Sequence, residues 1–337
     1  MMRIQSVRIA VTLMVGLMTG CATQQQQQAS SMMAQLYDGR PLSSLNVTDA
    51  AKTEQEAITR GDAAMREQND DLALFEYIRA LSLPSGQHRD QILYKIGRIH
   101  QLHQREALAD KAYQMALRDN PDNIDVLQQL GVINSKKGAF DVGKRYFLRA
   151  IDVDQERLNH PANLSQTRNP IEWVAALELD EHSPTDAYMG LGIIYDMDFH
   201  HELAQALYKK VLHIQPQSGK LLLNIGYSYY MSGDYLEAKR ATLAALALEP
   251  DNRRAQNNLA LIYLGHGKIQ RALNVLMQQM ESYEAFNRVG YFLMIQGDPG
   301  KAIPYLQQAI DEKPSYYQAA HENLERAVAD VNALANQ

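Results

Sequence analysis

A recurring pattern of small residues constrains the fold of this 337-residue chain more than any other feature of its sequence. Six glycines stand in helical context, at Gly61, Gly97, Gly131, Gly192, Gly226 and Gly290. A second small residue follows each of them after twelve positions, at Ala73, Ala109, Gly143, Ala204, Ala238 and Ala302. A seventh unit has Ala260 and Ala272 at these two places. Self-similarity of this kind predicts a stack of seven similar helical units.

Larger residues and prolines follow the same rhythm. Four positions after the second small residue come Tyr77, Tyr113, Phe147, Tyr208, Thr242, Leu276 and Leu306. The units begin near residues 54, 90, 124, 185, 219, 253 and 283, so three of the six steps are 34 residues long. This period and pattern resemble the helix–turn–helix signature of tetratricopeptide repeats. The resemblance implies an all-α tetratricopeptide-repeat superhelix of about seven helix–turn–helix units plus a capping helix.

Each position of the pattern has a physical explanation. The first small residue lets the first helix of a unit approach the second, and we expect the large residue to fill the space between neighbouring units. Prolines end the second helix in four units, at Pro121, Pro216, Pro250 and Pro314. The alternative fold is an irregular helical bundle.

The spacing also predicts the domain organisation. N-terminal tetratricopeptide units occupy 54–157, an insertion occupies 158–184, C-terminal units occupy 185–315, and a capping amphipathic helix occupies 316–337. The insertion contains three prolines and the only tryptophan, Trp173, and we expect one short helix around Ile171–Leu179. The capping helix should cover the exposed end of the stack, as solenoid proteins require.

The first 20 residues have the features of a signal peptide. Arg3 and Arg8 make the start positive, and the mostly apolar stretch Ile9–Met18 follows. As a helix this stretch would be only about 15 Å long, which is too short to cross a bilayer core of about 30 Å. We therefore predict a signal peptide at 1–20 rather than a transmembrane helix.

Cys21, the only cysteine, ends this segment after a small residue. The ending resembles the lipobox of bacterial lipoproteins, in which the cysteine is lipidated and becomes the new N-terminus, although Met18 stands where the family prefers Leu. Ala22 follows where an inner-membrane retention signal would place Asp. The resemblance implies a lipid anchor in the outer membrane, with the protein facing the periplasm. The alternative is a stray thiol near an ordinary secretory cleavage site.

A tether is predicted at 21–53, between the lipidated cysteine and the first repeat. The glutamine run Gln24–Gln28 opens it, and a weakly patterned stretch follows. Such a segment buries too little apolar surface to offset its ordering entropy, so we expect most of it to be disordered.

No motif in the sequence supports catalysis. The HHE sequence at 200–202 lacks a second histidine at helical spacing, and His100 and His103 have no accompanying carboxylates or cysteines. The GHGK sequence at 265–268 lacks the other residues of a phosphate loop and fits the turn between two helices of a repeat. The net charge of −6 argues against a general nucleic-acid binder. We therefore expect no enzyme activity, metal, cofactor, nucleic acid or small-molecule substrate.

The tetratricopeptide resemblance implies a groove that binds protein partners. In this family the first helix of each unit lines the concave face of the stack. The corresponding residues of the C-terminal units are Met189, Ile193, Tyr227, Tyr230, Met231, Asn257, Asn258, Leu261, Arg288, Tyr291 and Met294. Tyrosine and methionine on an exposed surface favour a partner helix or an apolar peptide. The alternative is that several face neighbouring helices as core residues, above all Tyr291 and Met294.

A narrower resemblance rests on the order of lipobox, tether and repeats, and on the stretches LNIGYSYYMSGDYLEAK and FNRVGYFLMIQGDPGKA. These resemble the TadD-like tetratricopeptide lipoproteins of the tight-adherence pilus assembly system, over roughly 190–327. The resemblance implies a scaffold that binds pilus or secretion components, including the outer-membrane secretin. Two alternatives remain: a pilotin-like lipoprotein of another type IV pilus secretin, and a lipoprotein regulator of envelope-building enzymes.

Replacing the predicted lipidation site tests the anchor. We expect Cys21→Ser to release the protein from outer-membrane fractions, because its acyl chains would be lost. Membrane fractionation together with labelling by a fatty-acid analogue measures both effects. A variant that stays in the outer membrane without acyl label would contradict the prediction.

Overall fold

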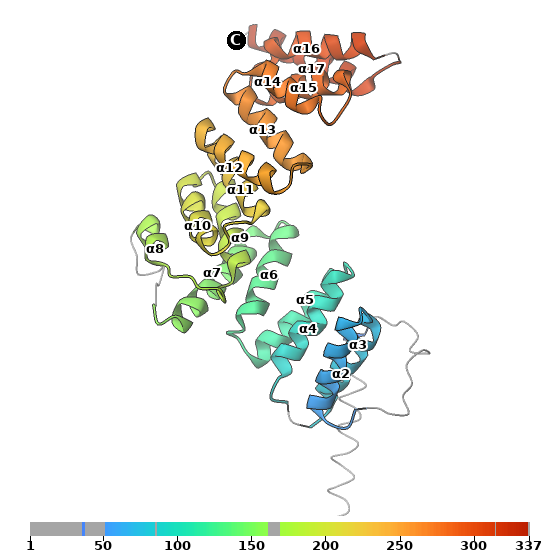
Figure 1. The fold of residues 1–337 in the computed structure, drawn as a ribbon, viewed down its shortest axis with the longest axis vertical. Helices are drawn as coiled ribbons and strands as arrows, with labels where there is room; N and C mark the ends of the chain where they lie inside the picture. Colours follow the sequence, from blue (N-terminus) through green and yellow to red (C-terminus); the bar gives the residue numbers. More distant parts are fainter. Residues whose placement is uncertain (1–35, 38–50, 85, 161–168, 314, 336–337) are drawn as a thin grey trace, which may run out of the picture. The chain divides into compact units, whose positions relative to one another are not determined.

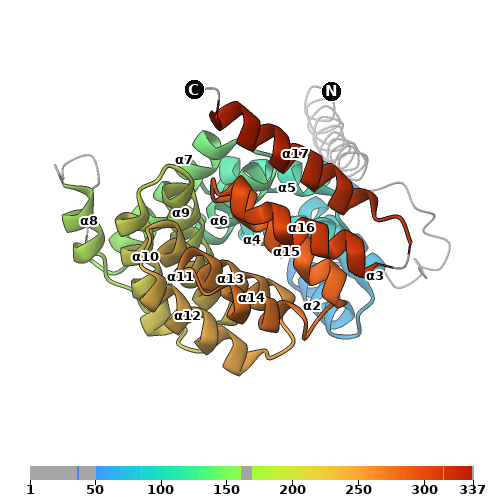
Figure 2. The same cartoon turned by 90° about the horizontal axis from the view of Figure 1, so that it is seen from above.

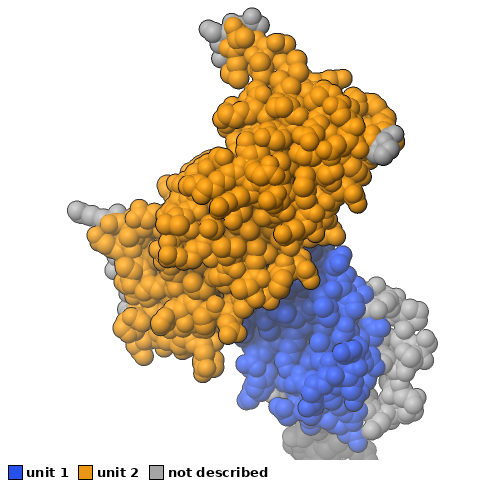
Figure 3. All heavy atoms as spheres, turned by 45° about the horizontal axis from the view of Figure 1, so that its top comes forward, with its two compact units in different colours: residues 1–154 blue, residues 155–337 orange. Residues whose placement is uncertain are grey.

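The structure is a computed structural model that describes residues 36–37, 51–84, 86–160, 169–313 and 315–335. In these residues the chain forms sixteen helices, labelled α2 to α17, and no strand (Figure 1). The chain consists of two compact units, and the division between them falls between Asp154 and Gln155 (Figure 3).

The helices of both units form consecutive antiparallel pairs, in which we term the first helix A and the second helix B. The first unit contains the pairs α2 (Glu54–Arg66) and α3 (Asp70–Ser82), α4 (Arg89–Leu102) and α5 (Glu106–Asp119), and α6 (Ile124–Lys136) and α7 (Phe140–Arg157), of which α7 runs past the division at Asp154. The second contains α9 (Thr185–Met197) and α10 (His201–Ile214), α11 (Gly219–Met231) and α12 (Tyr235–Leu248), α13 (Arg253–Gly265) and α14 (Ile269–Leu276), and α15 (Ser282–Ile295) and α16 (Pro299–Glu312). The predicted all-α fold of helix–turn–helix repeats is confirmed.

The glycine of helix A lies directly against a side chain of helix B in the same pair. A Cβ atom on Gly61 would lie 2.5 Å from Cε1 of Tyr77, and one on Gly192 would lie 2.5 Å from Cε1 of Tyr208. The same contact occurs in the pairs Gly97 with Tyr113, Gly131 with Phe147, and Gly290 with Leu306. Our expectation that the large residue fills the space between neighbouring units is therefore wrong. The large side chain instead covers the backbone that the glycine of its own unit leaves free.

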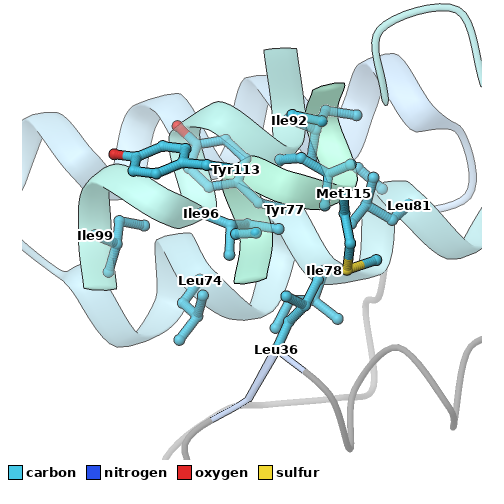
Figure 4. Close-up of a cluster of buried hydrophobic side chains, with 14 of the residues drawn as sticks. Leu36, Leu74, Tyr77, Ile78, Leu81, Ile92, Ile96, Ile99, Tyr113 and Met115 are labelled. Carbon is cyan, nitrogen blue, oxygen red and sulfur yellow. The ribbon is translucent and has the colours of Figure 1, made fainter. Parts of the chain in front are cut away.

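The core of the first unit includes a residue from the predicted tether. Leu36 is fully buried in the apolar cluster formed by α2 to α6 (Figure 4). The backbone carbonyl of Leu36 lies 2.7 Å from Nε2 of His100, which is also fully buried. The carbonyl of Ala51, another buried residue of the tether, accepts a hydrogen bond from Nε of Arg79 at 2.8 Å. At these two residues the predicted tether is ordered, because each contributes apolar surface and a hydrogen bond to the first unit.

The insertion forms the short helix α8 (Pro170–Ala176), which lies beside α10 (Figures 1 and 2). Trp173 is buried, with 1% of its surface exposed. Nζ of Lys210 donates to the carbonyls of Ala175 and Leu177 at 2.8 and 2.7 Å. We expected the helix to end at Leu179, but it ends earlier, at Ala176. The ammonium group of Lys210 binds the carbonyls at this end, and the backbone of Leu177 is extended.

Helix α17 (Gln318–Ala335) packs against α15 and α16 at the C-terminal end of the second unit (Figure 2). Ala320 and Ala327 are fully buried in this contact. Nδ2 of Asn323 donates to Oδ1 of Asn287 in α15 at 2.9 Å. The helix thus covers the last repeat with small residues and one polar bond.

Several predictions lie outside the residues that the structure describes. They are the signal peptide at 1–20, the lipidation of Cys21, the tether apart from its described residues, and the insertion at 161–168. Among the described helices, none has both the length and the apolar character needed to cross a bilayer.

The close contact between helices predicts the effect of a larger side chain at Gly226. A Cβ atom there would lie 3.2 Å from the carbonyl oxygen of Ala238 and would clash with Oγ1 of Thr242. We expect Gly226→Leu to lower the free energy of unfolding by about 1–3 kcal/mol or more, because α11 and α12 must move apart. Thermal unfolding followed by circular dichroism measures this.

Gly300→Leu is the matched control for this substitution. A Cβ atom on Gly300 would meet only Cγ2 of Val331, at 3.9 Å, and leucine favours helix more than glycine. We expect no loss of stability in the control. Equal melting of the two variants would contradict the close packing at Gly226.

Candidate functional site

Three of the predicted groove residues line one pocket of about 330 Å³ in the second unit. The pocket is formed by Ile193, Asp196, Met197, Phe199, Tyr208, Asn224, Tyr227, Met231 and Arg254. Its walls come from α9, α11 and α13, which are the A helices of three successive pairs, from Tyr208 of the B helix α10, and from the turn that follows α9. We term it the aromatic pocket.

Large apolar side chains are unusually exposed around the aromatic pocket. The exposed fractions are 39% for Ile193, 49% for Met197, 77% for Phe199, 44% for Tyr227 and 41% for Met231. Single exposed apolar residues are common on soluble proteins, but a contiguous patch beside a hollow marks a site of interaction. The patch therefore makes the aromatic pocket the leading candidate for binding.

The carboxylate of Asp196 holds the floor of the pocket in place. It accepts hydrogen bonds from the hydroxyls of Tyr208 at 2.9 Å and Ser228 at 2.6 Å, and it lies 2.8 Å from Nδ1 of His201. Burial, together with the charge and hydrogen bond of Asp196, raises the pKa of Tyr208 far above its usual value. Tyr208 therefore stays a neutral donor, and α9, α10 and α11 are joined through one acceptor.

Phe199 is the functional candidate that the sequence analysis missed. It lies in the turn between α9 and α10, where its φ of +61° is in the left-handed region. The corresponding turns of the other six pairs also have a residue of positive φ: Gln68, Gln104, Gly138, Gly233, Gly267 and Gly297. An alignment of these turns would have revealed the signal, because a phenylalanine replaces a glycine or glutamine.

A second pocket of about 370 Å³ contains two more predicted groove residues, Asn257 and Arg288. It is lined by Arg253, Asn257, Gln279, Met280, Glu284, Asn287, Arg288 and Tyr317, which belong mainly to α13, α15 and the segments after α14 and α16. We term it the arginine pocket. Its polar lining contrasts with the aromatic pocket, and the adjacent residues Arg253 and Arg254 line one pocket each.

The remaining predicted groove residues differ in exposure. Met189 is only 7% exposed and belongs to the buried residues of α9, so it is not available to a partner. Tyr230 is half-buried, and its hydroxyl accepts a hydrogen bond from Nε2 of Gln296 at 3.0 Å. Asn258, Leu261 and Met294 are half-buried as well, whereas Tyr291 is 40% exposed.

The histidines that could suggest a metal site have other contacts. His201 pairs with Asp196, and Nε2 of His103 lies 2.9 Å from Oδ2 of Asp70. His100 is buried against the Leu36 carbonyl rather than at a polar surface position. In the described part of the chain, no group of three or more histidine, cysteine, aspartate or glutamate residues is arranged to hold a metal ion.

Removing the carboxylate of Asp196 tests its structural role. We expect Asp196→Ala to lower the free energy of unfolding by about 2–4 kcal/mol, because the hydroxyls of Tyr208 and Ser228 lose a charged acceptor. Asp198→Ala, in the exposed turn nearby, should change it by about 0.5 kcal/mol or less. Chemical denaturation measures both variants, and equal effects would contradict the role of Asp196.

Comparison with known sequences identifies the repeat. Family models described as tetratricopeptide repeat match residues 223–279 and 283–316. Over 142 residues the chain is 27% identical to the tetratricopeptide repeat-containing protein trd-1 of Caenorhabditis elegans. This aligned region covers 42% of this chain and 18% of that protein. The chain thus spans less than a fifth of the length of the curated relatives that it matches.

Comparison with solved structures supports the same fold. A tetratricopeptide repeat protein from Parabacteroides merdae has 16% identity and a TM-score of 0.53, covering 82% of this chain and 100% of that chain. A pilF structure from Pseudomonas aeruginosa has 14% identity and a TM-score of 0.45, covering 82% of this chain and 97% of that chain. In the described residues the chain is therefore an all-α protein of paired helices with close glycine contacts, and its residues 223–279 and 283–316 match tetratricopeptide repeats.

Proposed function

We propose that this protein is a non-catalytic scaffold that binds a protein partner through the aromatic pocket. The observation that carries the proposal is the cluster of exposed apolar side chains around that pocket, including Phe199, Tyr227 and Met231. Tetratricopeptide repeats are protein-binding modules, and aromatic and methionine side chains give a partner contact area with adaptable packing. Neither a cofactor nor a small-molecule substrate is needed for this function.

The proposed location is the periplasmic face of the outer membrane, with a lipid anchor at Cys21. The supporting observations are the signal-like segment at 1–20, the lipobox-like ending and Ala22 after the cysteine. Several acyl chains would hold the protein firmly at the membrane, since each buried CH₂ contributes about 0.8 kcal/mol. The scaffold would then act where envelope-spanning machines are assembled.

The proposed partner is a component of a tight-adherence type pilus or secretion system, such as its secretin. This step rests on the resemblance of the region 190–327 to the lipoproteins of that system. A pilotin-like role toward another type IV pilus secretin, and regulation of an envelope-building enzyme, would use the same anchored scaffold. The identity of the captured protein distinguishes the three.

A photo-crosslinking amino acid at Tyr227 tests the function in the native bacterium. Irradiation followed by mass spectrometry should identify a pilus or secretion component bound to the full-length, anchored protein. Capture of another secretin would favour the pilotin-like role, and capture of an envelope enzyme would favour regulation. A crosslinker that reaches no protein would contradict the proposed binding face.

Truncating two side chains of the pocket should separate binding from folding. Tyr227 and Met231 lie one turn apart on α11 and are both exposed, so we expect Tyr227→Ala with Met231→Ala to change stability by about 1 kcal/mol at most. Partner capture should fall at least about tenfold, because aromatic anchors dominate binding energy. Tyr230 is left intact because it is half-buried and bonded to Gln296.

The matched control replaces two exposed leucines on a B helix of the same unit. Leu236 and Leu243 of α12 are 69% and 41% exposed and lie outside the aromatic pocket. Leu236→Ala with Leu243→Ala should leave partner capture unchanged. Equal loss of capture in both double variants would show that general surface hydrophobicity, rather than this pocket, holds the partner.

A further inference from the structure

Phe199 has a backbone conformation that is unfavourable for a bulky side chain. For residues other than glycine, the left-handed region is sparsely populated because Cβ approaches the following carbonyl oxygen. Burial could compensate for this cost, yet the Phe199 side chain is 77% exposed. An aromatic ring that is both strained and exposed is a sign of function rather than of stability.

One ring contact supports the side chain of Phe199. The ring meets that of His201 edge to face, with 6.2 Å between the ring centroids. His201 is in turn held by the carboxylate of Asp196, which lies on the floor of the aromatic pocket. The ring therefore projects from an ordered turn beside the pocket, which reduces the entropy that a partner must remove on binding.

Two arginines lie next to the apolar patch, one of which, Arg254, lines the aromatic pocket together with the carboxylate of Asp196, whose hydrogen bonds go to Tyr208 and Ser228. Arg253 and Arg254 occupy the first turn of α13, and this turn contains no acidic residue. Two cations at the positive end of a helix are unfavourable without a compensating anion. Neither arginine, nor Arg288 in the arginine pocket, forms an ion pair with a described residue. Glu284 is the one carboxylate that lines the arginine pocket.

Two residues that line the pockets each have a buried polar atom without a hydrogen-bond partner among the described residues. These atoms are Nδ2 of Asn224, a residue of the aromatic pocket, and Oδ1 of Asn257, a residue of the arginine pocket. A buried donor or acceptor without a partner costs free energy that a bound group can recover. The amide of Asn224 suits an acceptor such as a carbonyl or carboxylate oxygen.

We propose that the occupant of the aromatic pocket is an acidic, apolar peptide segment of the partner protein, and that Phe199 is its aromatic anchor. This inference rests on the proposed function and specifies the chemistry of the partner. Apolar side chains of the segment pack against Phe199, Tyr227 and Met231. Its carboxylates pair with Arg254 and, beyond it, with the guanidinium groups of the arginine pocket. Asn224 donates to an oxygen of the segment.

Synthetic peptides test the charge of the occupant with the full-length protein. The acidic probe is a fluorescein-labelled peptide of about 16 residues, roughly 24 Å long as a helix, with an apolar face of leucine and phenylalanine and glutamate elsewhere. The basic probe has lysine in place of glutamate, and a third probe has the acidic sequence scrambled. Fluorescence anisotropy should show at least about tenfold tighter binding of the acidic probe than of either other probe, and its affinity should fall as salt concentration rises.

The variant Phe199→Gly separates the anchor from the fold. Glycine adopts positive φ without strain, so the melting temperature should stay the same or rise by up to about 4 °C. The affinity for the acidic probe should nevertheless fall at least about tenfold. If Phe199 had only a structural role, its replacement would not weaken probe binding while the melting temperature stayed the same or rose.

Gln104→Gly is the matched control, because Gln104 occupies the same turn position in the first unit with a φ of +58°. It should change the melting temperature in the same direction and leave probe binding unchanged. Arg254→Ala should abolish most of the preference for the acidic over the basic probe, since it removes a charge without touching the apolar patch.

Several results would overturn the inference. Equal binding of the acidic and basic probes, or no binding of the acidic probe, excludes an acidic occupant. Unchanged affinity in Phe199→Gly excludes the anchor. The crosslink at Tyr227 tests the proposed function separately. A partner captured there by both the unsubstituted protein and Phe199→Gly would leave the scaffold function intact and remove only this inference.

Discussion

The contact between a glycine of helix A and a large side chain of helix B is the interaction on which the structure depends. A Cβ atom on Gly61 or Gly192 would overlap the ring of Tyr77 or Tyr208, so the helices can approach only where a side chain is missing. The ring then fills the space within its own pair, and the outer parts of helix A remain available. This arrangement provides a core from few residues and leaves the other face of helix A free for recognition.

The aromatic pocket is a direct product of this packing. Tyr208 packs its ring against Gly192 and donates its hydroxyl to Asp196, which also binds Ser228 of the next helix A. One side chain thus joins the repeat core to the floor of the pocket. The apolar residues above that floor are not needed for the core, which explains how the chain keeps them exposed without losing its fold.

The sequence predicted the structural features that depend on fixed spacing. It did not predict the features that depend on the contacts of individual residues. The helix pairs and the turn at Gly267 follow from the repeat, because close backbone approach demands small residues at set intervals. Met189 and Ile193 have the same apolar character on one helix, yet only the packing of neighbouring helices determines that the first is buried and the second exposed. The strain at Phe199 is a property of backbone angles, and periodicity does not report these.

The burial of Leu36 has a consequence for the geometry of anchoring. Leu36 comes fifteen positions after Cys21, and a chain of that length spans at most about 50 Å, compared with roughly 110 Å for the whole predicted tether to residue 53. In the proposed lipid-anchored form, the contact between His100 and Leu36 therefore attaches the tether to the first unit at residue 36. This attachment about halves the maximum distance between the first unit and the membrane. If Leu36 left the core, the maximum distance from the membrane at which the scaffold could meet its partner would about double.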